Sequence, residues 1–304
     1  MTRVEDSTLP SSAEPAALAA PGRIQLGSEA HKALFCTTLL QTHDPYKPSV
    51  MEWPKLDPTT RAKVVSLPIW DIAVQTEGKA SLNVRSYCDV IADPLLKAAV
   101  EMDAFEEARH KQVLASLVAA YDIALEPEPN YKHPRDPEWA FMVTGYSECI
   151  DSFFGFGLFA IARDSGFFPP ELVDTFEPVM REEGRHILFF VNWAAWWRRN
   201  MPIWRRPWFE LKVLAVWAFL IWERLGIAQD MEKSPKAQDN NFTLSGSKEL
   251  GVEITFAELA KVCLAENDRR LAPYAGALIR PKFVPNMIRL ALKLMPRPRV
   301  VAAA

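Results

Sequence analysis

Cysteine is scarce in this sequence, and its four copies form no spaced pair. They lie far apart, with no Cys-x-x-Cys spacing, at Cys36, Cys88, Cys149 and Cys263. Neither a disulfide framework nor a thiolate zinc site is therefore indicated. Such cysteine usage favours a reducing compartment, and we expect a cytoplasmic protein.

The sequence also lacks an excess of charge of one sign. Its 35 basic and 38 acidic residues leave a net charge of −3, which argues against a nucleic-acid-binding protein. The apolar run from Val213 to Trp222 is too short to cross a bilayer. What the sequence does have is enough apolar residues for a large core, at 49% of the chain.

One five-residue pattern of acid, Glu, any residue, Arg and His occurs twice, at 106–110 and at 182–186. Residues three apart on an α-helix lie one above the other on the same face. Glu107 therefore pairs with His110, and Glu183 with His186, as one oxygen and one nitrogen ligand for a metal ion. A solvated charged helix face is the alternative, and the apolar stripes around both histidines argue against it.

Four periodic stretches predict long helices, at 67–92, 95–123, 139–165, and from 170 or 177 to 199. Glu77 lies on the apolar stripe of the first stretch and Glu148 on that of the third. Glu77 precedes Glu107 by 30 residues and Glu148 precedes Glu183 by 35, which suits antiparallel helix pairs with ligands near their middles. Asp151, one turn after Glu148, is left open as a rival or auxiliary ligand.

Four carboxylates on buried stripes would be costly unless cations balanced them. Two divalent ions would do so, and oxygen-rich ligands with one imidazole per ion favour iron or manganese over zinc. Iron, manganese and a mixed pair all remain open.

The other members of each pattern suit a supporting role around the ligands. Glu106 and Glu182 each lie four residues before a histidine, so we expect each to accept the second imidazole N–H from its own helix and to fix the tautomer. Arg109 and Arg185 are expected to pair with these acids or with the opposite helix.

Both motifs resemble those of the ferritin-like di-iron carboxylate superfamily, in its oxygen-activating branch, which includes acyl-carrier-protein desaturases and bacterial multicomponent monooxygenase hydroxylases. The resemblance covers roughly residues 67–199 and implies an all-α, ferritin-like four-helix bundle with two iron ions. The implied iron ligands are Glu77, Glu107, His110, Glu148, Glu183 and His186. The residues implied to support them are Glu106, Arg109, Glu182 and Arg185.

The regions outside the bundle are assigned by composition. Residues 1–26, rich in Ala, Pro and Ser, are expected to be a disordered tail, and 27–66 a helix and a linker that carry His31 and His43 in structural or exposed positions. The bundle would fill 67–200, and 201–304 would be a helical extension that packs on it, with helices at about 207–225 and 256–270 and a polar loop at 229–253.

The extension is rich in tryptophan and, near its end, in cations. Seven of the ten Trp lie between Trp193 and Trp222, and the stretch 280–299 has six basic residues and no acid. These features suit peripheral contact with an anionic membrane surface. A core helix and a solvated C-terminal helix are the alternatives, and a homodimer is left open.

The leading functional hypothesis is an oxygen-dependent oxidoreductase. It would use dioxygen to hydroxylate, desaturate or otherwise oxidise a small, apolar organic substrate. No flavin, nicotinamide or iron–sulfur motif is present, so electrons must come from a separate donor. A ferritin-type metal-handling protein and a metal-free helical interaction protein are the alternatives. Six phenylalanines near the motifs would line an apolar cavity or form plain core: Phe153, Phe154, Phe156, Phe159, Phe189 and Phe190.

Overall fold

The computed structural model describes residues 24–67, 69–166, 168–231 and 254–295. All regular secondary structure in these ranges is helical, which confirms the prediction of an all-α protein. The tail expected at 1–26 and the loop expected at 229–253 lie mostly outside the described residues.

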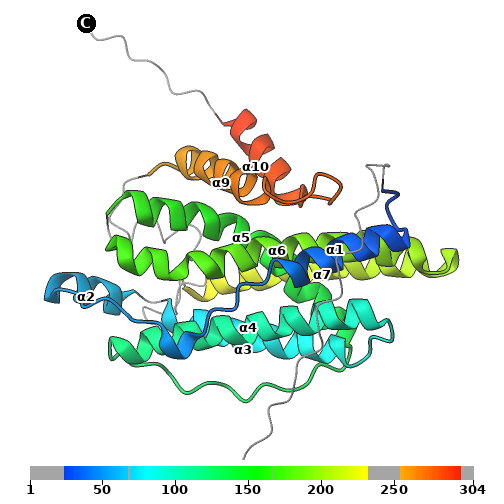
Figure 1. The fold of residues 1–304 in the computed structure, drawn as a ribbon. Helices are drawn as coiled ribbons and strands as arrows, with labels where there is room; N and C mark the ends of the chain where they lie inside the picture. The colour runs from blue at the N-terminus through cyan, green and yellow to red at the C-terminus, as the bar shows by residue number, and fades with distance from the viewer. Residues whose placement is uncertain (1–23, 68, 167, 232–253, 296–304) are drawn as a thin grey trace, which may run out of the picture.

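Four long helices coincide with the four periodic stretches. They are α3 (Trp70–Cys88), α4 (Pro94–Ala120), α5 (Pro137–Asp164) and α6 (Pro170–Asn200). α3 packs against α4 and α5, and α6 packs against α5 and α4, with the pair α3 and α4 below α5 and α6 in Figure 1. The two helices that carry the repeated motif, α4 and α6, are therefore in direct contact.

An Asp-Pro dipeptide begins α4 and α5. Asp93 and Asp136 accept the backbone N–H of the residue three positions later, and the proline that follows each occupies the first turn, where no N–H is needed. The same device, Asp57-Pro58, begins a helix that the sequence analysis treated as linker, α2 (Pro58–Ser66). The expectation of a plain linker there was wrong.

The N-terminal part lies against the motif helices. α1 (Glu29–Gln41) packs on α4 and α6, and buried His31 fixes it through a 2.9 Å hydrogen bond between its Nε2 and Oδ1 of Asn192. The chain then runs across α4 and α6 and through the short turn η1 (Pro48–Val50) to α2 (Figure 1).

The C-terminal helices pack on α5. α7 (Arg206–Met231), which follows the short turn η2 (Ile203–Arg205), lies on α5, as do α9 (Phe256–Leu271) and α10 (Phe283–Leu294). α9 approaches α5 closely at Gly157, where a Cβ atom would lie 2.3 Å from Sγ of Cys263. No helix in the described ranges combines the length and apolarity needed to cross a membrane.

An aromatic core fills the space between the helices. Phe141 lies edge-to-face against both Phe190 and Trp193. A Cβ on Gly145 would lie 2.1 Å from the ring of Phe190. Most of the phenylalanines singled out from the sequence are core residues at most 1% exposed: Phe153, Phe156, Phe189 and Phe190.

Candidate metal centre

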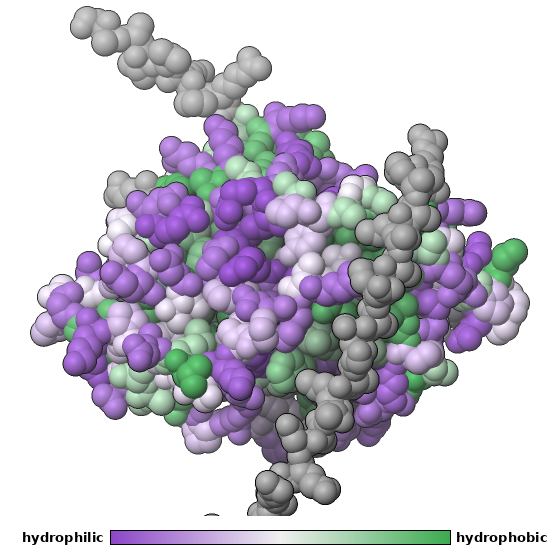
Figure 2. Space-filling model, in the orientation of Figure 1, coloured by the Kyte–Doolittle hydropathy of each residue, from purple (hydrophilic) through white to green (hydrophobic). Residues whose placement is uncertain are grey.

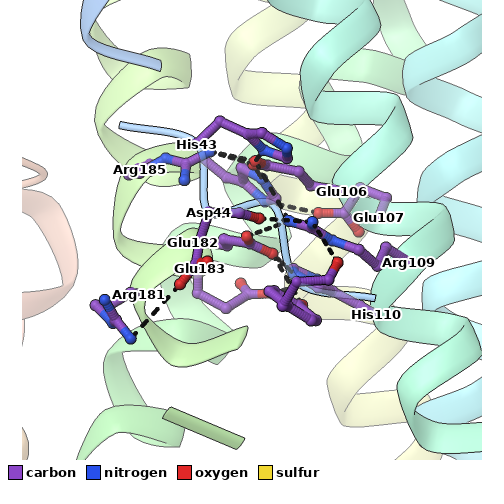
Figure 3. A network of polar contacts seen from close by, with 12 residues as sticks. His43, Asp44, Glu106, Glu107, Arg109, His110, Arg181, Glu182, Glu183 and Arg185 are labelled. Atoms are coloured by element: carbon purple, nitrogen blue, oxygen red, sulfur yellow. Dashed lines mark hydrogen bonds and ion pairs between the residues drawn. The ribbon is translucent and has the colours of Figure 1, made fainter. Parts of the chain in front are cut away.

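The two Glu-x-x-His pairs face each other across the contact between α4 and α6 (Figure 3). Nδ1 of His110 lies 3.3 Å from Oε1 of Glu183, and Nδ1 of His186 lies 2.8 Å from Oε1 of Glu107. One ligand atom from each of the four side chains fits within a group whose members are all within 4.8 Å of one another. The two copies of the motif therefore bring two carboxylate oxygens and two imidazole nitrogens into one group.

Three of the four inner atoms of this group lack hydrogen bonds. Oε1 of Glu107 and Nδ1 of both His110 and His186 are buried and have no hydrogen-bond partner among the described residues. The 2.8 Å contact between His186 and Glu107 is a close approach without hydrogen-bond geometry. Buried polar atoms in proteins are almost always satisfied, so unpartnered nitrogens and oxygens that converge are what a cation site requires.

The outer nitrogen of each imidazole meets a carboxylate of the opposite helix. Nε2 of His110 lies 2.9 Å from Oε2 of Glu182, and Nε2 of His186 lies 2.8 Å from Oε2 of Glu106. This differs from the same-helix pairing expected from the sequence. An imidazole whose Nδ1 points into the centre directs its Nε2 across the helix contact, so the nearest acid belongs to the other motif.

The arginines of the motifs also cross between the helices. Arg109 donates to Glu182, and Arg185 donates to Glu106, with each pair almost fully buried. The sequence analysis left open whether the arginines pair with acids of their own motif or with the opposite helix, and the structure shows pairing with the opposite helix. Each outer carboxylate therefore receives one imidazole and one guanidinium, both from the opposite motif.

The segment between α1 and η1 closes this network on its outer side. Arg109 donates to the carbonyl oxygens of Asp44 and Tyr46 at 2.7 and 3.1 Å, and Arg185 donates to that of Thr42 at 2.8 Å. The Tyr46 hydroxyl donates to Glu182 at 3.1 Å, and Nδ1 of His43 lies 2.6 Å from Oε1 of Glu106.

His43, Glu106 and Glu182 form a second group with metal-ligand geometry. Its two carboxylates are already neutralised by Arg109 and Arg185. We therefore interpret this second group as part of the support around the imidazoles.

The carboxylates nearest the centre are crowded with like charges. Burial raises the pKa of Glu107 to about 8, because it and the charge of Glu77 outweigh the opposing effect of His186. Burial, together with the charges of Glu107 and Asp103, raises the pKa of Glu148 well above its usual range. Several acids that cannot all ionise next to one another would be relieved by a bound cation.

The outer acid Glu106 behaves in the opposite way. Burial alone would raise the pKa of Glu106, but the hydrogen bond from His186 and the charge of Arg185 hold it well below its usual range. Glu106 is therefore a fixed negative charge, suited to accept the imidazole N–H of His186.

The two carboxylates assigned by spacing lie beside the four-residue group, each on a helix of its own. Oε2 of Glu77, on α3, is 3.8 Å from Nδ1 of His110, and its side chain is 19% exposed. Glu148, on α5, interacts electrostatically with Glu107, Glu183 and His186. Both helices thus contribute one acid to the surroundings of the four-residue group.

Asp151 does not belong to the site. It is exposed on α5 and pairs with Arg224 of α7 at 2.8 Å, and it also accepts a hydrogen bond from Ser147. The prediction of Asp151 as a rival or auxiliary ligand was wrong, because its side chain is exposed and pairs with α7 instead of facing the other ligands.

Two buried groups near the centre were not identified from the sequence. Asp103, one turn before Glu107 on α4, places its unpartnered Oδ1 3.6 Å from Nε2 of His186, and burial raises its pKa to about 6 against the effect of that histidine. Ser152 of α5 donates to Oε2 of Glu183 at 2.7 Å. The sequence could have indicated Asp103, because residues four apart on a helix share a face and Asp103 lies four before Glu107. Ser152 belongs to no motif, so nothing in the sequence pointed to it.

Comparison of the chain with protein-family models, with curated proteins and with solved structures finds no match. The interpretation of the site therefore depends on its own residues and geometry.

Proposed function

We propose that this protein is an oxygen-dependent oxidoreductase whose two-metal site lies in a ferritin-like bundle formed by α3, α4, α5 and α6. The observation that carries the proposal is the convergence of four side chains, of which three have buried inner atoms without hydrogen bonds: Glu107, His110, Glu183 and His186 converge, and Glu183 is the exception. Two Glu-x-x-His pairs with one further Glu from each of two other helices form the ligand set of di-iron and di-manganese carboxylate sites. Glu77 and Glu148 supply those two acids.

The donor set favours iron or manganese. Carboxylate oxygens outnumber imidazole nitrogens, and the four described cysteines are buried as free thiols elsewhere in the fold. Zinc prefers fewer ligands and often thiolate. Two bound iron ions would supply the electron transfer that activates dioxygen, with electrons from a separate donor protein.

The chain's own residues prepare the site in three ways. Glu182 and Glu106 hold the Nε2–H of His110 and His186, so that each Nδ1 lone pair points inward. Ser152 holds one oxygen of Glu183 and leaves the other directed to the centre. Three of the ligands are also shielded from water, since Glu107, His110 and His186 are at most 2% exposed.

Anaerobic loading of the purified protein with Fe(II), followed by an optical spectrum on admission of oxygen, tests the proposal. We expect about two irons per chain, as a two-metal site requires, and an oxygen-dependent absorbance change. Glu107→Ala should remove the specific iron. Glu101→Ala is the matched control, because Glu101 is exposed on the same helix.

Two results would contradict the proposal. Iron far in excess of two per chain would instead support a metal-handling protein of the ferritin type. No specific binding of iron or manganese, and a stability unaffected by Glu107→Ala, would support a metal-free interaction protein.

A further inference from the structure

The outward face of α7 is apolar from residue 207 to residue 222. Its large exposed side chains recur at helical spacing and are 52–71% exposed: Trp208, Leu211, Leu214, Ile221 and Trp222. The charged residues of this stretch lie on the flanks and are already paired. Glu210 binds Arg198, and Lys212 binds Glu138. This α7 row therefore presents apolar surface without compensating charge.

The outward face of α10 has the same character. Phe283, Met287, Leu290 and Leu294 form one row and are 49–76% exposed, whereas Ile288 on the opposite face is buried against α5 and α9. Figure 2 shows apolar and hydrophilic side chains next to each other over α10, at the top of the molecule. A helix with one buried and one exposed apolar face has room for a second partner.

The α7 row and the α10 row belong to two helices that both pack on α5 and that touch each other. α7 packs along the first half of α5, where its Trp217 lies 5.3 Å from Tyr146, and Ile288 of α10 packs in a cluster with Phe153 of the second half. The two helices meet where the rings of Trp217 and Phe283 are 4.4 Å apart. Both rows face away from α5, and the ring contact connects α7 with the start of the α10 row. The two rows are together called the apolar surface.

Cations border this surface. Residues 274–295 include Arg280, Lys282, Arg289 and Lys293 and contain no Asp or Glu. Lys282 and Lys293 are exposed, and neither forms an ion pair within the described ranges. A binding partner that matches this surface must combine an apolar region, which contacts the two rows, with negative charges, which contact the lysines.

We propose that the α7 row and the α10 row dock this protein onto an anionic lipid bilayer. The tryptophan and leucine side chains would enter the boundary between headgroups and acyl chains, and the lysines would contact lipid phosphates. A second copy of this chain fits the surface less well, because a two-fold axis would bring the same cations towards each other. The inference goes beyond the proposed oxidation chemistry and does not depend on it.

Flotation of the full-length protein with lipid vesicles tests this inference. Vesicles of phosphatidylcholine with about one-third phosphatidylglycerol should carry the protein at low salt, and pure phosphatidylcholine vesicles should carry much less. Added salt should release it, because screening weakens the contribution of exposed cations. The measurement is made on metal-free and on iron-loaded protein, so its outcome is independent of the metal site.

Two double variants separate the apolar and the charged contributions. Trp208→Ser with Leu290→Ser should weaken vesicle binding at least about tenfold, since two large apolar side chains no longer enter the bilayer. The matched control is Val50→Ser with Val90→Ser, at positions 73% and 62% exposed elsewhere. All four side chains are largely exposed, so the helical circular-dichroism signal should not change.

Lys282→Gln with Lys293→Gln should weaken binding to anionic vesicles by about fivefold for each lysine. Lys55→Gln with Lys132→Gln, at exposed positions away from the surface, is the control for net charge. An absence of flotation with anionic vesicles at low salt would overturn the inference, as would equal losses in variants and controls. A dimer in light scattering that Trp208→Ser with Leu290→Ser dissociates, with no vesicle binding, would assign the surface to a second copy.

Discussion

Glu106 and Glu182 link the two motifs, because each holds the imidazole and the guanidinium of the opposite one. Replacing Glu106 by Gln keeps an acceptor near His186 but removes the charge that Arg185 and the imidazole share. We expect metal affinity to fall about 10- to 100-fold without being abolished, as when the partner of a ligating histidine is removed. Competitive titration with Fe(II) or Mn(II) measures this, with Glu101→Gln as the control. An unchanged affinity would show that the crossed pairing does not position the ligands.

Tyr46 acts on the same network from the segment outside the bundle. Tyr46→Phe removes the hydroxyl that donates to Glu182 at 3.1 Å, and we expect the free energy of unfolding to fall by about 0.5–1.5 kcal/mol. Tyr131→Phe removes a similar hydrogen bond, 3.0 Å long, to the carbonyl of Gln75. Denaturant titrations should show comparable losses for both variants. Only Tyr46→Phe should also lower metal affinity, and equal affinities would refute a role for Tyr46 in the site.

At the scale of single residues, the sequence predicted which side chains meet but not how they pair. Glu107 and His110 come together because helical spacing alone puts them on one face. The contact between His43 and Glu106 joins residues 63 positions apart, and it depends on the path of the chain after α1. No local pattern records that path. Asp103 was recognisable, since it lies one turn before Glu107 on the same stripe.

At the scale of helices, α5 needs small residues where a neighbour crosses it. A Cβ on Gly157 would lie 2.3 Å from Sγ of Cys263, so Gly157→Ala must displace α9. We expect the free energy of unfolding to fall by about 1–3 kcal/mol, the usual cost of overpacking a core. Thermal or urea unfolding followed by circular dichroism measures the change.

Gly155, two residues earlier, is the matched control for that substitution. No atom lies within 4 Å of the Cβ that Gly155→Ala would add. Alanine is favoured over glycine by about 1 kcal/mol in a helix interior, so Gly155→Ala should be neutral or stabilising. Equal destabilisation by both alanines would mean that the contact between α5 and α9 is not tightly packed.

The four long helices were readable from apolar periodicity, which located α3, α4, α5 and α6. The structure adds that Asp-Pro dipeptides begin α4 and α5. α2 was missed, although Asp57-Pro58 gives the same signal, because its nine residues are too few to show a clear period. The rotation of α4 relative to α6, which decides the crossed pairing, depends on tertiary packing that periodicity does not encode.

Across the whole molecule, the two halves are related in sequence but interlocked in space. α3 and α4 carry an acid and one motif, and α5 and α6 carry the same set. Glu106 of the first half contacts the imidazole of His186 in the second half, and Glu182 of the second half contacts that of His110 in the first. Neither half can therefore complete its ligand geometry alone. Metal binding and the packing of the two halves should be thermodynamically coupled.

That coupling predicts that metal stabilises the entire fold. Without a cation, Glu107 and Glu148 lie among like charges, and a bound divalent ion would relieve both. At a free metal concentration about 100 times the dissociation constant, binding adds about 2.7 kcal/mol to the free energy of unfolding. For a chain of 304 residues the midpoint of thermal unfolding should rise by roughly 3–5 °C. Differential scanning calorimetry with Mn(II), before and after addition of a chelator, measures the shift.

In Glu107→Ala the shift should disappear, whereas Glu101→Ala should retain it. A shift of equal size in both variants would place the stabilising metal outside the contact between α4 and α6.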